Sequence, residues 1–125
     1  MNIEAVATDR APKALGPYSQ AIRAGDTVYV SGQVPIDPTT GRLIEGGIRE
    51  QTRQTIANII AIVRSAGGSI NSIVQVTVFL ANWDDFPAMN EVYMELFREP
   101  YPARSTIQNS RPMGALVGAD AIAVV

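Results

Sequence analysis

The stretch IVQVTVFL at residues 73–80 constrains the fold more than any other part of the chain. Strand side chains alternate between two faces, so one face of this segment is wholly apolar and comprises Val74, Val76, Val78 and Leu80. That face is predicted to lie against helices. The opposite face mixes Ile73 and Phe79 with polar residues, so we expect another subunit to cover it.

Helical patterns flank this strand on both sides. Apolar residues recur at helical spacing within residues 48–66, and Gly67 and Gly68 follow as a stop signal. A second helix is predicted over residues 84–98, with Asn82 or Asp84 as its cap. Its inward-facing side chains are predicted to be Phe86, Met89, Tyr93, Leu96 and Phe97.

The remaining strands complete a single domain over residues 1–125. Residues 21–24 and 27–34 form a hairpin pattern around Gly25 and Asp26, and residues 104–109 and 116–125 supply two more strands. The predicted order is ββαβαββ, an α+β domain with two helices on one face of a mixed sheet. Small residues at alternate positions of the last strand allow close backbone approach, and with the mixed face they predict a closed homo-oligomer.

Composition excludes several kinds of chemistry. The chain has no cysteine and no histidine, which removes thiolate nucleophiles, disulfides and the commonest general base. Histidine and cysteine are also the commonest zinc ligands, so we expect no metal centre. The net charge is −2 and the ten basic residues are dispersed, which argues against nucleic acid or an anionic membrane as partner. Without a signal-peptide pattern or a long apolar run, a cytoplasmic location is expected.

Two charged residues are candidates for a binding or catalytic role. Arg104 follows Pro102 at the start of a strand, and its planar fork matches a carboxylate or a phosphate. Its alternative role is pairing with an acid of the same protein. Asp120 interrupts the most apolar stretch of the chain, so it must be paired or lie at a cleft. The alternative there is an ion pair within the sheet or between subunits.

Three polar positions are weaker candidates. Tyr18 lies in a proline-containing loop, and Ser31 precedes Gly32, where the lack of a side chain exposes the backbone to a ligand. A half-buried core tyrosine and a serine that satisfies a backbone group are the alternatives. Asn90 lies on the second predicted helix, where a solvated surface residue is the alternative.

Several fragments occur together in a specific order, and the chain resembles the Rid family along nearly its whole length. These proteins are the reactive intermediate deaminases, also called YjgF-like and sometimes labelled endoribonuclease L-PSP. The fragments are GPYSQ at 16–20, VYVSGQVP at 28–35, SAGG at 65–68, VTVFL at 76–80, NEVY at 90–93, PARS at 102–105 and AIAV at 121–124.

The resemblance implies a homotrimer with a chorismate-mutase-like fold and clefts between subunits. It implies cofactor-free hydrolysis of enamines and imines, such as 2-aminoacrylate, to 2-keto acids and ammonia. By the same resemblance Arg104 holds the substrate carboxylate, and the main-chain carbonyl of Thr106 helps to place the imine nitrogen or the water. The cleft is lined by Tyr18, Ser31, Gly32 and Asn90.

The last strand departs from the family pattern. Where active deaminases resemble E-x-E-A-I-A, this chain has G-A-D-A-I-A, so the water-positioning glutamate falls on Gly118 and Asp120 matches the second acid. On a strand these two positions share a face and lie about 6–7 Å apart. Two functions therefore remain open: an imine deaminase with an altered water site, or a regulatory trimer that binds small carboxylates with little or no catalysis. A ribonuclease ranks last, because the chain is acidic and lacks a basic, aromatic surface.

Overall fold

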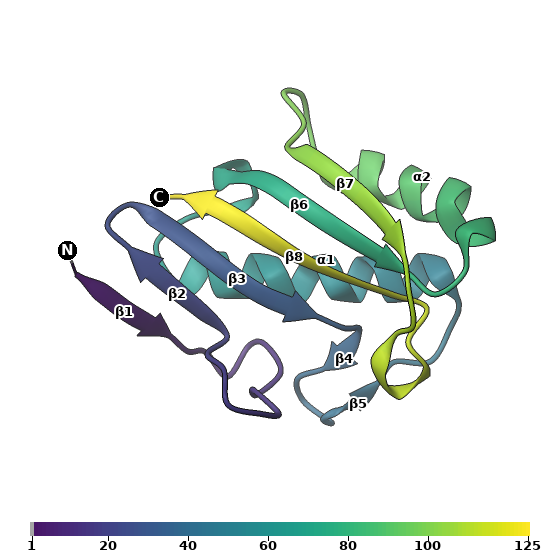
Figure 1. Ribbon diagram of the computed structural model, residues 1–125, viewed down its shortest axis with the longest axis horizontal. Coiled ribbons are helices and arrows are strands. Elements are labelled where there is room, and N and C mark those ends of the chain that lie inside the picture. Colours follow the sequence, from purple (N-terminus) through teal and green to yellow (C-terminus); the bar gives the residue numbers. More distant parts are fainter. Residues whose placement is uncertain (1) are drawn as a thin grey trace.

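The computed structural model describes residues 2–125, which form one mixed sheet with two helices packed on one of its faces (Figure 1). The helices are α1 (Ile48–Ser65) and α2 (Phe86–Leu96). The strands of the large sheet are β1 (Ile3–Val6), β2 (Ala21–Ala24), β3 (Thr27–Gln33), β6 (Ile73–Leu80), β7 (Ala103–Gln108) and β8 (Val117–Val124). A separate short ribbon pairs β4 (Ile36–Asp37) with β5 (Arg42–Leu43).

The strand order in the sheet is β1-β2-β3-β8-β6-β7. All neighbours are antiparallel except β6 and β7, which run parallel because α2 connects them (Figure 1). This architecture confirms the predicted α+β class and the two helices on one face. The predicted element order omitted β1, which is short and mostly exposed, and the β4–β5 ribbon, whose strands have two residues each and so carry no alternating pattern.

The core lies between α1 and the central strands. Ile59, Ile62 and Val63 of α1 are fully buried, and they face a row of small residues on β8. That row consists of Ala119, Ala121 and Ala123, all buried. Because alanine side chains are short, the helix axis can approach the sheet closely. The sequence analysis had taken the same alanines as a sign of contact between subunits, whereas in the structure α1 of the same chain covers them.

The beginning of β6 corrects one sequence prediction. Strict alternation placed Val74 on the helix-covered face, yet its side chain is 46% exposed, whereas Ile73 is buried. The register against β8 shifts between Ile73 and Gln75, which is the mark of a β-bulge. The extra residue reverses the face to which the side chains before it point, so the predicted alternation holds only from Val76 onward.

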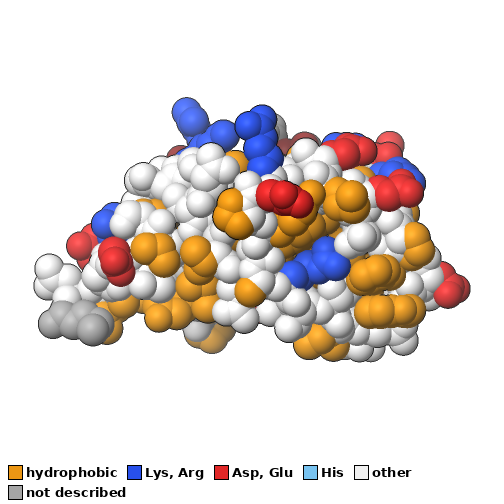
Figure 2. Space-filling model, turned by 90° about the horizontal axis from the view of Figure 1, so that it is seen from above, with side chains coloured by type: hydrophobic (Ala, Val, Ile, Leu, Met, Phe, Trp, Pro, Cys, Tyr) orange, Lys and Arg blue, Asp and Glu red, His pale blue; other side chains and the backbone are white. Residues whose placement is uncertain are grey.

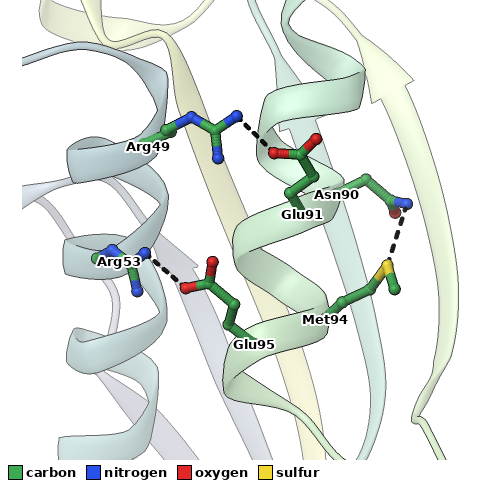
Figure 3. A network of polar contacts seen from close by, with 6 residues as sticks. All are labelled: Arg49, Arg53, Asn90, Glu91, Met94 and Glu95. Carbon is green, nitrogen blue, oxygen red and sulfur yellow. Dashed lines mark hydrogen bonds and ion pairs between the residues drawn. The ribbon is translucent and has the colours of Figure 1, made fainter.

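The two helices are joined along their exposed sides. Arg49 pairs with Glu91 at 2.5 Å, and Arg53 pairs with Glu95 at 2.6 Å (Figure 3). These pairs are largely solvated, so they orient α2 on α1 more than they stabilise the fold. The stronger attachment comes from the buried side chains of α2, Met89, Val92 and Tyr93.

The opposite face of the sheet has no cover within residues 2–125. Tyr29, Ile107 and Val124 are between 45% and 51% exposed there. Ile122 and Phe79 lie on the same face and are half-buried. The mixed second face predicted for β6 is therefore part of a larger apolar surface that spans four strands.

A pair of matched substitutions tests the bulge. Val76→Ala removes two fully buried methyl groups and should lower the free energy of unfolding by about 1.5–3 kcal/mol. Val74→Ala removes an exposed side chain and should change it by less than about 0.5 kcal/mol. Denaturant titrations at equal protein concentration provide the comparison. Equal losses for both variants would show that the strand alternates regularly and that the bulge is absent.

Candidate functional site

Arg104 lies on the edge strand β7, on the side of the sheet that carries the helices. Its register partner in β6 is Val76, which is buried under the helices. The guanidinium carbon lies 4.6 Å from the ring centroid of Tyr93 and 5.6 Å from that of Phe86. Two aromatic rings of α2 therefore hold the cation by cation–π contact and fix its position at the sheet edge.

Within residues 2–125 the guanidinium donors of Arg104 form no ion pair with an acidic side chain. Within residues 2–125 both ion pairs involve other arginines, so the alternative in which Arg104 pairs with an acid of its own chain does not hold there. The guanidinium opens onto a pocket of about 310 Å³. The pocket is lined by Asn90, Tyr93, Met94, Tyr101, Pro102 and Arg104.

Asn90 shares this pocket, as the sequence analysis proposed for a cleft residue. Its side-chain amide contacts the sulfur of Met94 at 3.9 Å, a weak interaction between neighbouring turns of α2 (Figure 3). Because this contact is weak, the side-chain amide of Asn90 can still hydrogen-bond a ligand in the pocket that it shares with the Arg104 guanidinium. Tyr93, Met94 and Tyr101 also line the pocket but were not named as site residues from the sequence. Tyr93 was assigned to the core because an aromatic side chain at helical spacing is typical of a buried helix face.

A second pocket of about 460 Å³ gathers the other predicted binding residues. It is lined by Tyr18, Ser31, Gly32, Gln33, Val34, Arg111 and Pro112. A register shift in β3 between Val30 and Gln33 places Ser31 and Gly32 in a bulge that turns them out of the regular ladder. A Cβ on Gly32 would meet nothing within 4 Å, so the backbone there borders open space.

The hydroxyls of this second pocket already have one partner each. Ser31 donates from its side chain to the carbonyl of Ser19 at 2.6 Å, which is the backbone-satisfying role considered from sequence. The Tyr18 hydroxyl accepts from the backbone N–H of Leu15 at 3.1 Å, which leaves its own proton available to a ligand. Tyr18 is 48% exposed and so is not a core residue.

A buried amide orders the loop that carries Tyr18. Gln20 accepts from the backbone N–H of Thr8 at 2.7 Å and donates to the carbonyls of Thr8 and Pro12. Its side chain is 6% exposed, so these bonds satisfy a polar group that would otherwise be costly to bury. The loop is thereby fixed from both sides of Tyr18.

Gly118 and Asp120 lie on the uncovered face of the sheet. Gly118 is opposite Phe79 and Asp120 is opposite Thr77, so the two positions share a face as the strand geometry predicted. This is the face opposite to Arg104, and Asp120 lines neither pocket. Burial raises the pKa of the Asp120 carboxyl, and hydrogen bonding by Thr77 partly offsets the rise.

Thr106 lies two residues beyond Arg104 on β7, opposite Val78. Because β7 is an edge strand, alternate backbone carbonyls have no strand partner on its outer side. A main-chain acceptor at this edge is thus compatible with the role that the resemblance gives to Thr106. A single chain thus brings Arg104 and Asn90 together in the first pocket. Tyr18, Ser31 and Gly32 line the second pocket, apart from the first.

Arg111 is a pocket residue that the sequence analysis did not select. Its guanidinium carbon lies 4.7 Å from the ring centroid of Phe79. A Cβ built on Gly118 would lie 2.6 Å from one of its terminal nitrogens, so the arginine occupies the space beside the glycine. No sequence pattern marks Arg111 as a pocket residue, because the residue that makes room for it is a glycine, which has no side chain.

The surface carries charges of both signs. Seen from above, hydrophobic side chains are interspersed with acidic and basic ones, and no extended basic patch is visible on that face (Figure 2). Residues 2–125 contain no cluster of three or more side chains arranged to ligate a metal. No helix in that range is long and apolar enough to cross a membrane.

A family model described as Endoribonuclease L-PSP matches residues 8–125. The chain belongs to the Rid family. A RutC family protein of Pyrococcus abyssi is 50% identical over 121 residues, which cover 96% of this chain and 95% of that protein. A Mus musculus protein named 2-iminobutanoate/2-iminopropanoate deaminase is 42% identical over 120 residues, covering 95% and 89%. The crystal structure of E. coli TdcF with bound serine has a TM-score of 0.92 and 40% identity, and each chain covers 98% of the other.

The raised pKa of Asp120 predicts a pH-dependent stability difference. Between the ordinary aspartate pKa and the raised value, the folded chain binds more protons than the unfolded chain, so stability falls as pH rises. Asp120→Asn should therefore raise the unfolding free energy at about pH 7, with an advantage that shrinks toward about pH 4. Asp9→Asn, at an exposed loop position, is the control. If the stability advantage of Asp120→Asn over the wild type grew as the pH was lowered, the raised pKa of Asp120 would be contradicted.

Proposed function

We propose that this Rid-family chain is an imine deaminase that hydrolyses small 2-imino acids, including those formed from 2-aminoacrylate, to 2-keto acids and ammonia. The observation that supports this most is the Arg104 fork, which faces a pocket without an acidic partner within residues 2–125. A small 2-imino acid carries a carboxylate that such a fork binds in two parallel hydrogen bonds. Close relatives named as deaminases of such substrates support the same activity.

The complete site requires a second copy of the chain. Arg104 and Asn90 lie on the helix side of the sheet edge, whereas Tyr18, Ser31 and Gly32 line the other pocket. We propose a homotrimer in which the Arg104 pocket of one copy joins the Tyr18 pocket of the next. The uncovered apolar sheet face supports this assembly, since Tyr29, Ile107 and Val124 would otherwise remain in water.

The reaction needs few groups. Arg104 anchors the carboxylate, and the Thr106 carbonyl accepts a hydrogen bond from the imine N–H. Water then adds to C2 and forms a carbon–oxygen bond, while a proton passes to the nitrogen. The carbon–nitrogen bond of the resulting carbinolamine then breaks as the proton of its new hydroxyl passes to the nitrogen. Ammonia leaves, and the hydroxyl oxygen becomes the carbonyl oxygen of the 2-keto acid. An enamine enters the same route after its carbon is protonated to give the imine.

Activation of the water is the step at which this chain departs from the family pattern, because Gly118 stands where the pattern has a glutamate. General acid–base assistance typically accelerates a reaction by about 10²–10⁴. Asp120 shares the face of Gly118 but lines neither pocket of the single chain. The alternative function is therefore a trimer that binds small carboxylates and regulates by binding, with weak or no hydrolysis.

Removing the carboxylate anchor tests the proposal directly. Arg104→Ala should abolish acceleration of imine loss and weaken 2-oxobutanoate binding by about tenfold or more, because a charge-assisted bidentate contact is lost. The imine is generated in situ by an amino-acid oxidase and the remainder is trapped with semicarbazide; calorimetry measures binding. Arg64→Ala, at an exposed position of α1, is the charge-matched control. Wild-type rates equal to the protein-free control would favour the binding function.

Restoring the carboxylate tests the water site. Gly118→Glu should raise kcat for 2-iminopropanoate if the missing glutamate limits the rate. The new Cβ would press on the Arg111 side chain, which can move, and would lie 3.0 Å from the carbonyl of Gln33. Gly118→Ala introduces the same Cβ without the acid and is the steric control. Equal kcat values for both variants and an active wild type would assign water activation to another group.

A further inference from the structure

Arg111 is a partly buried cation in the second pocket, and no carboxylate neutralises it within residues 2–125. Neither ion pair of that part of the chain involves it, and its Nε–H donates to the carbonyl of Ser110 at 3.2 Å. The guanidinium lines the pocket together with Tyr18 and Ser31. It therefore directs positive charge into the pocket that lies apart from Arg104.

Gly118 makes this position of the guanidinium possible. A Cβ at residue 118 would lie 2.6 Å from a terminal nitrogen of Arg111, closer than two such atoms can approach. The guanidinium carbon also lies 4.7 Å from the ring centroid of Phe79, which is opposite Gly118 on β6. The arginine thus lies against an aromatic ring and beside a glycine, and its positive charge stands where a glutamate would bring a negative charge.

A cation in this environment favours an anionic ligand. Burial lowers the pKa of the Arg111 guanidinium, since desolvation disfavours the charged form. A bound carboxylate would restore the lost solvation by charge-assisted hydrogen bonds. Tyr18 adds a hydroxyl proton that its contact with the Leu15 N–H leaves unused.

We propose that Arg111 and Tyr18 form a second carboxylate subsite, so that the chain prefers dicarboxylic 2-imino and 2-keto acids over substrates with an apolar tail. This inference rests on the proposed function, in which Arg104 of a neighbouring copy holds the first carboxylate. The two guanidinium groups then define the two ends of one substrate. In this proposal the carboxylate that pairs with Arg111 belongs to the ligand and not to an acidic residue of the neighbouring copy.

Binding of two keto acids to the intact assembly tests the subsite. 2-Oxoglutarate and 2-oxopentanoate have the same carbon chain and differ only in the terminal carboxylate. Calorimetry should show that the wild type binds 2-oxoglutarate about tenfold or more tightly. In Arg111→Gln the two affinities should become equal through loss of 2-oxoglutarate binding, and Arg111→Lys should keep part of the preference. Arg64→Gln, which removes the same charge at a distant exposed site, should keep the wild-type ratio.

Two further variants separate this inference from the proposed function. Arg104→Gln should weaken both ligands by a similar factor, because it removes the shared anchor. Gly118→Glu should abolish the preference for 2-oxoglutarate, because the new carboxylate neutralises Arg111. A 2-oxoglutarate preference without imine hydrolysis would leave the subsite standing while the deaminase proposal fails. Equal affinities in the wild type, binding of neither ligand, or an unchanged ratio in Arg111→Gln would overturn the subsite.

Discussion

The packing of α1 against β8 is the interaction on which the rest of the structure depends. Branched side chains of the helix, such as Ile59 and Ile62, meet a row of alanines on the strand, and this contact defines one covered face of the sheet. Side chains alternate along each strand, so the covered face also determines which residues point away from it. Arg104 therefore lies on the helix side, whereas Gly118 and Asp120 lie on the uncovered side. The division of the site into two pockets follows directly from this one-sided packing.

Buried amides fix the loops that carry the second pocket. Gln20 holds the loop before β2, and Asn58 of α1 donates to the carbonyl of Ile36 at 3.0 Å. Gln51 accepts from the backbone N–H of Leu116 at 2.8 Å, which attaches the segment between Arg111 and β8 to the helix. These side chains satisfy backbone groups that leave the regular ladders, and buried polar groups without partners would destabilise the fold. The same contacts that stabilise the core thus position Tyr18 and Arg111.

The electrostatics of the second pocket distinguish this chain from the family pattern that its sequence resembles. A glutamate at residue 118 would place a negative charge where a guanidinium now lies against Phe79. A carboxylate can activate water, while a permanently protonated guanidinium cannot accept a proton but binds anions. On the function and the subsite proposed above, this exchange shifts the pocket from assisting hydrolysis toward recognising the ligand. The same proposals link catalysis to substrate preference, because both would depend on whether residue 118 bears a side chain.

The sequence by itself determined the fold class, the helices and most of the strands, because apolar periodicity and the Gly25–Asp26 turn are local signals. It also selected Arg104 and Asn90, which the structure brings into one pocket. The bulge at Val74 escaped prediction, since a register shift depends on the partner strand and not on local alternation. Arg111 was not predicted as a pocket residue either, because its surroundings also depend on residues from other parts of the chain. Its role arises from a glycine seven positions later and from a ring on another strand, and only the tertiary structure places those groups around one guanidinium.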